Sequence, residues 1–583
     1  MDTQNQNGVY YNPNPYLKPK KEYKPFTKND ITFLLLTFFA GFILIDFAIM
    51  KGFHLGFTIS YLIIFVISTL YVFNKESKPS VFTTLCGALS LVAAVPLSLY
   101  YNALVNAFSV VLIIGLFTIY IIGISNTFKR SQSNFKIGFD MFETAAISPF
   151  ESISEVAGSI KAGANKGKKY LSALLGIAVA LPVLGVVIPL LVESDAAFEK
   201  LINIVLKNIG IYIGELIAAC VILPYTYSLL FAKKHPSTPD YRKNKKTSDL
   251  RKIPVPGCIS FLCVISITYL VYLFSQLAYF FSAFKGLLPE GYTRTASAFA
   301  RRGFVEMFAI CVINVLIISG VSAFSKRVEN GKRSIAIKLF SLFISLFSLL
   351  LIATAMQKMK LNISTYGFTV NRLLVSILMV MTAVVLIFFI IHIFLPKVSY
   401  MQPLIIICSV IFIFAAFSNL DSITANYNVS LYTSGELKSV DIAELRDMGN
   451  ESIPAVIELT KSKDKKVSHE AEMALIEMVY EKANFYNDDT EANEYNMNYG
   501  DFRAWYLSKE KAHKAIKEYE NSLDGAKKTE YNKRVSMIKN KDYHYSGIDA
   551  YDDEDYFDNY ENNKTYYYNP KTDSYDIEKK VYE

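Results

Sequence analysis

The stretch ALVNAFSVVLIIGLFTIYIIGIS, residues 103–125, decides the class of this protein because it contains no charged side chain. At ~1.5 Å per residue, a helix of this length crosses the ~30 Å hydrocarbon core of a bilayer. Backbone amides in lipid need internal partners, so the segment must be a helix. Ten similar apolar runs occupy residues 31–50, 53–73, 81–100, 170–192, 209–232, 256–284, 304–325, 335–356, 373–394 and 401–420. We therefore expect an all-α, polytopic transmembrane helix bundle of eleven spans.

The charges predict how the bundle is oriented. Residues 1–420 hold 38 Lys and Arg against 18 Asp and Glu, whereas residues 421–583 hold 22 against 34. If the N-terminus lies inside, the inside connections carry 27 Lys and Arg and the outside ones carry 10. Basic residues are retained on the cytoplasmic side. We expect a bacterial plasma-membrane protein with a cytoplasmic N-terminus and, because the span number is odd, an extracytoplasmic C-terminus.

The polar segments outside the spans suggest a domain organisation. Residues 1–29 are rich in Asn, Pro, Tyr and Lys and predict a disordered basic tail. Residues 30–420 form the transmembrane domain, within which 135–162 has the pattern of a cytoplasmic amphipathic helix. Residues 421–520 are expected to form a small extracytoplasmic helical domain, because 436–520 show helical periodicity. Residues 521–583 form an acidic, Tyr-rich tail that we expect to be largely disordered beyond about residue 547.

Polar side chains inside or beside the spans are the best candidates for a site, since an unpaired one at depth costs several kcal/mol. Asp46 and Glu215 should therefore have partners. The loop before residue 304 gathers arginines at a helix start, where an anion would bind; pairing with local acids is the alternative. The candidate anion or substrate site comprises Arg294, Arg301, Arg302, Glu306, Asn314, Tyr366, Asn371 and Arg372.

Signatures of catalysis are not found in the sequence. The six histidines are scattered without ligand spacing, and the six cysteines all lie in apolar runs. No GxSxG elbow occurs. We expect no catalytic residue, cofactor or metal, and no nucleic-acid partner, because topology alone explains the basic loop at 233–252. The expected partners are the lipid bilayer, including anionic headgroups, and a cell-wall or protein partner of the C-terminal region.

Three short motifs carry a family resemblance. They are FARRGF at 299–304 with Glu306 and Asn314 following, YGFTVNR at 366–372, and SNLDSITANYNV at 418–429. Over about residues 30–520 the chain resembles an uncharacterised bacterial integral-membrane family, domain of unknown function 4173, which is close to its relative 4153. The resemblance implies a membrane domain whose last span leads into a helical segment, and it implies no activity.

Three functions fit these observations. The first is a non-enzymatic envelope sensor or scaffold whose extracytoplasmic C-terminal region binds a partner. The alternative is a transporter or lipid-handling protein that uses a polar Arg/Glu/Asn site between helices, including Arg301, Glu306 and Asn314. A membrane enzyme acting on an anionic lipid-linked substrate is the third, and no nucleophile or base can be named for it.

Overall fold

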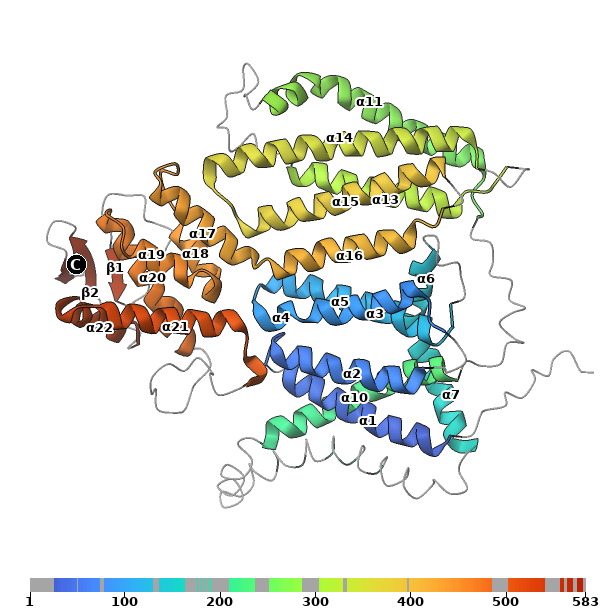
Figure 1. Cartoon of the computed structure of the whole chain (residues 1–583), viewed down its shortest axis with the longest axis horizontal. Coiled ribbons are helices and arrows are strands. Elements are labelled where there is room, and N and C mark those ends of the chain that lie inside the picture. Colours follow the sequence, from blue (N-terminus) through green and yellow to red (C-terminus); the bar gives the residue numbers. More distant parts are fainter. Residues whose placement is uncertain are drawn as a thin grey trace, which may run out of the picture.

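The computed structural model in Figure 1 describes residues 26–49, 51–73, 78–128, 136–162, 209–235, 251–285, 304–328, 333–395, 398–484 and 502–539, with five single positions between 176 and 190 and three short segments between 556 and 579. Up to Lys539, its regular elements are helices. The all-α polytopic architecture is therefore confirmed.

Residues 26–124 form the first four crossings, and polar side chains fix where the helices begin. Thr27 and Asp30 form a capping box. Ser80 and Asn102 cap two later helices by accepting hydrogen bonds from backbone amides. The helices are α1 (Lys28–Leu44), continued by the π-helical turn η1 (Ile45–Ile49), α2 (Leu55–Val72), α3 (Val81–Ala94), α4 (Pro96–Leu99) and α5 (Ala103–Ile124).

Two helices then lie across one end of the bundle before the chain returns to it (Figure 1). Here Val156 packs on the helices, whereas Phe142 and Phe150 are exposed, and the interfacial role expected for 135–162 stays a prediction. The elements are α6 (Lys136–Phe142), the π-helical turn η2 (Glu143–Ile147) and α7 (Ser148–Ala162). The bundle continues with α10 (Ile209–Lys234), α11 (Val255–Lys285), α13 (Phe304–Phe324), α14 (Ile335–Tyr366), α15 (Val370–Phe394) and α16 (Met401–Phe417).

The number of spans agrees with the prediction wherever the structure describes the chain. Nine helices there are long and apolar enough to cross a membrane, and a bent pair with an angle of 55° between its helices raises the number to ten. The pair is α16 and α17 (Leu420–Thr433), and between them Asn419 has a left-handed backbone with φ 47°. These ten crossings coincide with ten of the eleven predicted runs. In the remaining run, 170–192, the structure describes five single positions, so this crossing stays a prediction.

The bundle has two distinct ends. At the first, which we call the basic end, α1 begins and α2, α5, α10, α13 and α15 finish. There Asp30 accepts a hydrogen bond from Tyr71 at 2.8 Å and lies 3.0 Å from His235 Nε2. The connections at this end carry most of the bundle's Lys and Arg. The opposite, domain end bears the C-terminal helices (Figure 1). Thus the last helical domain lies at the end opposite the basic connections.

The fold itself shows that the chain changes ends between α7 and α10. Ser159 of α7 accepts a hydrogen bond from Phe26 N at the basic end. Near the start of α10, Glu215 is in hydrogen-bonding contact with Asp46 at the domain end. The run predicted at 170–192 lies between these two helices in the sequence, and its crossing stays a prediction.

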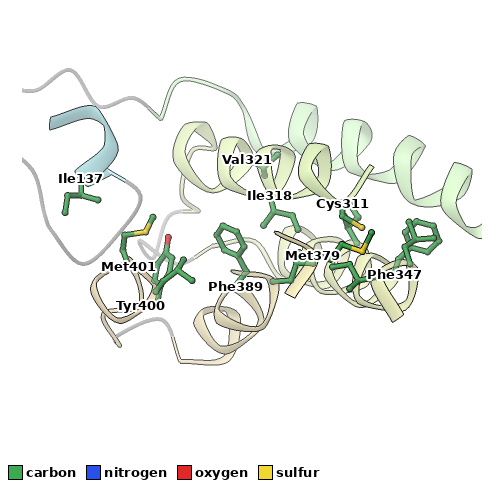
Figure 2. Packing of buried hydrophobic residues seen from close by; sticks show 14 of the residues in the cluster. Ile137, Cys311, Ile318, Val321, Phe347, Met379, Phe389, Tyr400 and Met401 are labelled. Atoms are coloured by element: carbon green, nitrogen blue, oxygen red, sulfur yellow. The ribbon is translucent and has the colours of Figure 1, made fainter. Parts of the chain in front are cut away.

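The bundle core is apolar, and so is much of the bundle's outside. Figure 2 shows part of the largest cluster, in which Cys311, Phe347 and Met379 come from α13, α14 and α15. On the outside, Val111 and Phe414 are 67% and 75% exposed. An apolar surface of this kind suits contact with lipid tails and not with water.

The C-terminal domain has a core of its own. Ala425, Val456, Leu475 and Ile516 are fully buried in it. Its helices after α17 are α18 (Ile442–Asp447), η3 (Gly449–Glu451), α19 (Ile453–Leu459), α20 (Lys465–Asn484), η4 (Phe502–Ala504), α21 (Leu507–Ser522) and α22 (Gly525–Lys539).

The structure extends this domain beyond the predicted boundary at residue 520. Tyr531 and Val535 of α22 pack into the core. Two apolar contacts on a Lys-rich segment give a weak periodicity, which explains why the sequence pattern missed the helix.

Beyond about residue 547 the structure describes three short segments, and the expectation that this tail is largely disordered stays a prediction. An antiparallel sheet there has the order β1 (Tyr556–Asn559), β2 (Lys564–Asn569) and β3 (Ser574–Lys579). Tyr567 lies opposite Tyr556 on one side and Asp576 on the other. Tyrosine favours strands, which accounts for a small sheet in a region of high charge.

Candidate functional site at the junction of the bundle and the C-terminal domain

The turn between α14 and α15 is held by an asparagine from the C-terminal domain. Gly367 adopts φ +75°, which favours glycine, and a Cβ at this position would lie 2.4 Å from Asn428 Oδ1. Asn428 Oδ1 accepts a hydrogen bond from Phe368 N at 2.7 Å, and its Nδ2 donates to Phe368 O at 2.8 Å. One buried side chain of α17 thus satisfies both backbone groups of Phe368. We call this contact the amide clamp.

Arg372 extends the amide clamp toward α18. Its Nη1 donates to Gly367 O at 3.0 Å, which stabilises the turn from the other side. It also interacts electrostatically with Glu444 of the C-terminal domain. Burial, with the neighbouring Asp441 carboxylate, raises the pKa of Glu444 to about 7, although Arg372 opposes the shift. Glu444 therefore changes its charge near neutral pH at this contact.

A second link joins the turn between α4 and α5 to η3. Glu451 is 4% exposed, accepts a hydrogen bond from Tyr101 N at 2.9 Å and accepts another from Asn419 Nδ2 at 2.8 Å. Burial raises the pKa of the Glu451 carboxyl group, while these hydrogen bonds oppose the shift. Beside it, Asn102 Nδ2 donates to both carboxylate oxygens of Asp421, at 3.0 and 2.8 Å. Buried carboxylates with such partners act as fixed attachment points.

A third link places a charge from the C-terminal domain against the first span. Arg503 of η4 forms a 2.5 Å ion pair with Asp46 in η1. Glu215 of α10 contacts Asp46 and interacts electrostatically with Arg503 and Lys51. The predicted need of Asp46 for a partner is therefore met, by a residue 457 positions away, whereas Glu215 Oε2 is buried without a hydrogen-bond partner among the described residues.

Backbone contacts keep this third link close. Leu55 N donates to Trp505 O at 3.1 Å, at the start of α2. A Cβ on Gly56 would lie 2.4 Å from Phe47 O and 2.9 Å from Arg503 O. Only glycine allows the three backbone segments to approach this closely.

Aromatic rings fill the space between the second and third links. His54 stacks on Tyr506 with ring centroids 4.8 Å apart, and Tyr506 also faces Tyr101 at 6.1 Å. Asn450 Nδ2 donates to the Tyr506 hydroxyl at 2.6 Å. Burial and the Lys509 charge lower the pKa of His54 to about 4. The imidazole is neutral at pH 7, so it contributes packing and not charge.

The structure distributes the predicted site residues over different surroundings. Arg294, Arg301 and Arg302 lie outside the described residues. Glu306 is exposed and lies within electrostatic range of Lys358.

The remaining residues of the predicted site lie in different places. Asn314 is fully buried, accepts a hydrogen bond from Tyr269 at 2.6 Å and donates to Ser348 at 2.8 Å. Tyr366 ends α14, and Asn371 is exposed in the first turn of α15. Of the set, Arg372 belongs to the junction. The shared substrate site of the transporter hypothesis stays a prediction.

Sequence reasoning missed the residues that complete the junction. Asn428 lies within the quoted motif at 418–429, but the motif does not indicate that its side chain reaches Phe368. Arg503 gives no signal beyond its place beside Trp505, the one tryptophan of the chain. Within the described part of the chain, no group of three or more His, Cys, Asp or Glu could hold a metal ion. The arrangement is suited to holding the C-terminal domain against the bundle through contacts that include ionisable side chains.

Comparisons with known proteins identify a family and no activity. No curated protein and no solved structure matches the chain. One family model matches residues 61–459, which include the amide clamp and Glu451 and end before Arg503. The matching model is that of family 4153, which was expected as the relative, and not that of 4173, so the resemblance given above is corrected in its number. The chain belongs to this family, which is described as a domain of unknown function, DUF4153.

Proposed function

We propose that this protein is a non-enzymatic envelope sensor of the bacterial plasma membrane. In this proposal, the C-terminal helical domain binds a cell-wall component or a protein, and the junction passes the resulting change to the bundle. The observation that carries the proposal is the Arg503–Asp46 ion pair, which joins a charge of the C-terminal domain to the first span. A scaffold tethered by α17 alone would not need this contact.

The other two links support coupling over a broad area of the bundle. Tyr101 and Phe368 are main-chain contact points in different turns, and each is bound by a buried side chain of the domain. Movement of the domain would therefore act on several helices together. Such a set of contacts is suited to two discrete arrangements, which signalling requires.

The charge distribution supports an extracytoplasmic domain. The domain lies at the end opposite the basic connections, and Lys and Arg are retained in the cytoplasm. Cysteines at Ser546 and Ser248 test this placement in intact cells treated with a membrane-impermeant maleimide. We expect labelling at Ser546→Cys alone. Labelling at Ser248→Cys alone would reverse the orientation and place the partner in the cytoplasm.

Hydrogen exchange tests whether the junction transmits a change. Arg503→Ala leaves Asp46 buried without its cation, so the contact between η4 and the first span should open in the full-length protein. Lys461→Ala is the matched control, because Lys461 is exposed on the same domain. We expect faster amide exchange in Arg503→Ala at the basic end of α2 and α10 as well as at the domain end. Exchange that changes only at the domain end would leave the domain as an anchor and refute transmission.

A further inference from the structure

A pocket opens at the basic end between α13, α14 and α15. The space between its walls, including open solvent, is about 570 Å³. Its floor includes Ile318 and Phe389, which Figure 2 shows in the same apolar cluster. Its described lining includes five basic side chains and no acidic one: Arg251, Lys326, Arg327, Arg333 and Lys338.

A short backbone pairing brings the first three of these cations to one side of the pocket. Ile253 N donates to Phe324 O at 3.1 Å, and Lys326 N donates to Ile253 O at 3.0 Å. This bridge ties the segment before α11 to the end of α13. Arg251 therefore reaches the same pocket as Lys326 and its neighbour Arg327, although they are far apart in sequence.

The opposite wall combines a held arginine with a helix start. Arg333 Nη2 donates to Ser322 Oγ at 2.7 Å, which fixes the guanidinium beside the pocket. Ser334, the N-cap of α14, lines the pocket and makes no capping hydrogen bond with its side chain. The first turn of a helix carries partial positive charge, and Lys338 adds a full charge one turn further on.

The surroundings of Arg333 indicate an excess of positive charge. Burial lowers the pKa of its guanidinium, Arg327 and Arg251 lower it further, and Tyr400 opposes the shift. An anion between these groups would reduce their mutual repulsion. Planar guanidinium groups suit phosphate oxygens, which can accept paired hydrogen bonds.

The helices beside the pocket present a lipid-facing surface. Ile335 and Leu339 of α14 are 74% and 61% exposed, and Phe394 of α15 is 64% exposed. A molecule with a phosphate headgroup and acyl chains would match both the basic lining and these side chains.

We propose that this pocket binds a phosphate-bearing anion, and that its source is the headgroup of an anionic phospholipid. Basic pockets between transmembrane helices at a cytoplasmic surface have the required chemistry. The site lies at the end opposite the junction and does not depend on the proposed sensor function.

Native mass spectrometry of the full-length protein tests the proposal. The protein is purified from nanodiscs of phosphatidylcholine with phosphatidylglycerol, and retained lipid is measured. In Arg327→Gln/Arg333→Gln, affinity for phosphatidylglycerol should fall about 30-fold, or about 2 kcal/mol, from about 1 kcal/mol per basic residue. The double variant Lys28→Gln/Lys78→Gln is the matched control, because it removes two exposed cations at the basic end outside the pocket lining. It should change affinity less than threefold.

The remaining outcomes separate the sources of phosphate. The conservative variant Arg327→Lys/Arg333→Lys should retain most binding, which distinguishes loss of charge from loss of fold. If inorganic phosphate protects the wild-type protein thermally and phosphatidylglycerol is not retained, the pocket takes a soluble anion. Equal loss in the pocket and control variants, or no retention and no protection, would overturn the proposal.

Discussion

Replacing Asn428 with alanine tests the amide clamp most directly. The side chain is 8% exposed and makes two hydrogen bonds to Phe368, of 2.7 and 2.8 Å. Each contributes about 1 kcal/mol net, so their loss should favour opening of the turn by about 2 kcal/mol. That energy corresponds to a roughly 30-fold larger open population.

Amide hydrogen exchange of the protein in nanodiscs measures this opening. Phe368 N donates to Asn428, so a peptide containing Phe368 should exchange about 30-fold faster in Asn428→Ala. Asn426→Ala is the matched control on the same helix, because Asn426 is exposed and its amide donates to Ser422 within the helix. Asn428→Asp keeps an acceptor and should show a smaller effect. Equal exchange in Asn428→Ala and Asn426→Ala would refute the clamp.

Three further predictions concern other contacts. Gly56→Ala should weaken the attachment of the domain by about 1–3 kcal/mol, because the new Cβ would lie 2.4 Å from a carbonyl oxygen. Gly41→Ala is the control, because a Cβ there would meet open space. Limited proteolysis compares the two variants. The pKa of Glu444 is about 7 in the folded domain and 4.5 ordinarily, so protonation of Glu444 favours the folded domain. The stability of the domain should therefore fall as the pH rises from about 4.5 to 7. Glu444→Gln should flatten the profile of melting temperature against pH. Asp30→Ala should destabilise the protein by about 2–4 kcal/mol and lower its melting temperature at pH 7, because Asp30 is 1% exposed and binds Thr27, Tyr71 and His235. An unchanged melting temperature would contradict a structural role for Asp30.

The spans could be predicted because length and apolarity are local properties. The run at 103–125 and the helix Ala103–Ile124 differ by one residue at the end. The partner of Asp46 could not be predicted in the same way. The cost of burying the carboxylate requires a partner, but nothing in the sequence near Asp46 specifies Arg503.

The family motifs indicated the segments that form the amide clamp but not how they pair. The stretches 366–372 and 418–429 were marked by resemblance, and the structure places Gly367 of the first against Asn428 of the second. Their pairing depends on how α15 and α17 pack, which short motifs do not encode. In the segments at 556–579, Tyr567 pairs with Tyr556 and Tyr568 with Tyr575, and composition alone does not indicate these cross-strand pairs.

The long separation between Asp46 and Arg503 also has a consequence during synthesis. The two residues are 457 positions apart, and a ribosome adding about 5–20 residues per second needs roughly 20–90 s to cover that distance. Through this interval the first helices are already made, while Asp46 lacks the arginine that pairs with it in the folded protein. The nascent chain therefore passes through a long-lived, incompletely assembled state in the membrane, in which quality-control proteases and insertion chaperones have time to act.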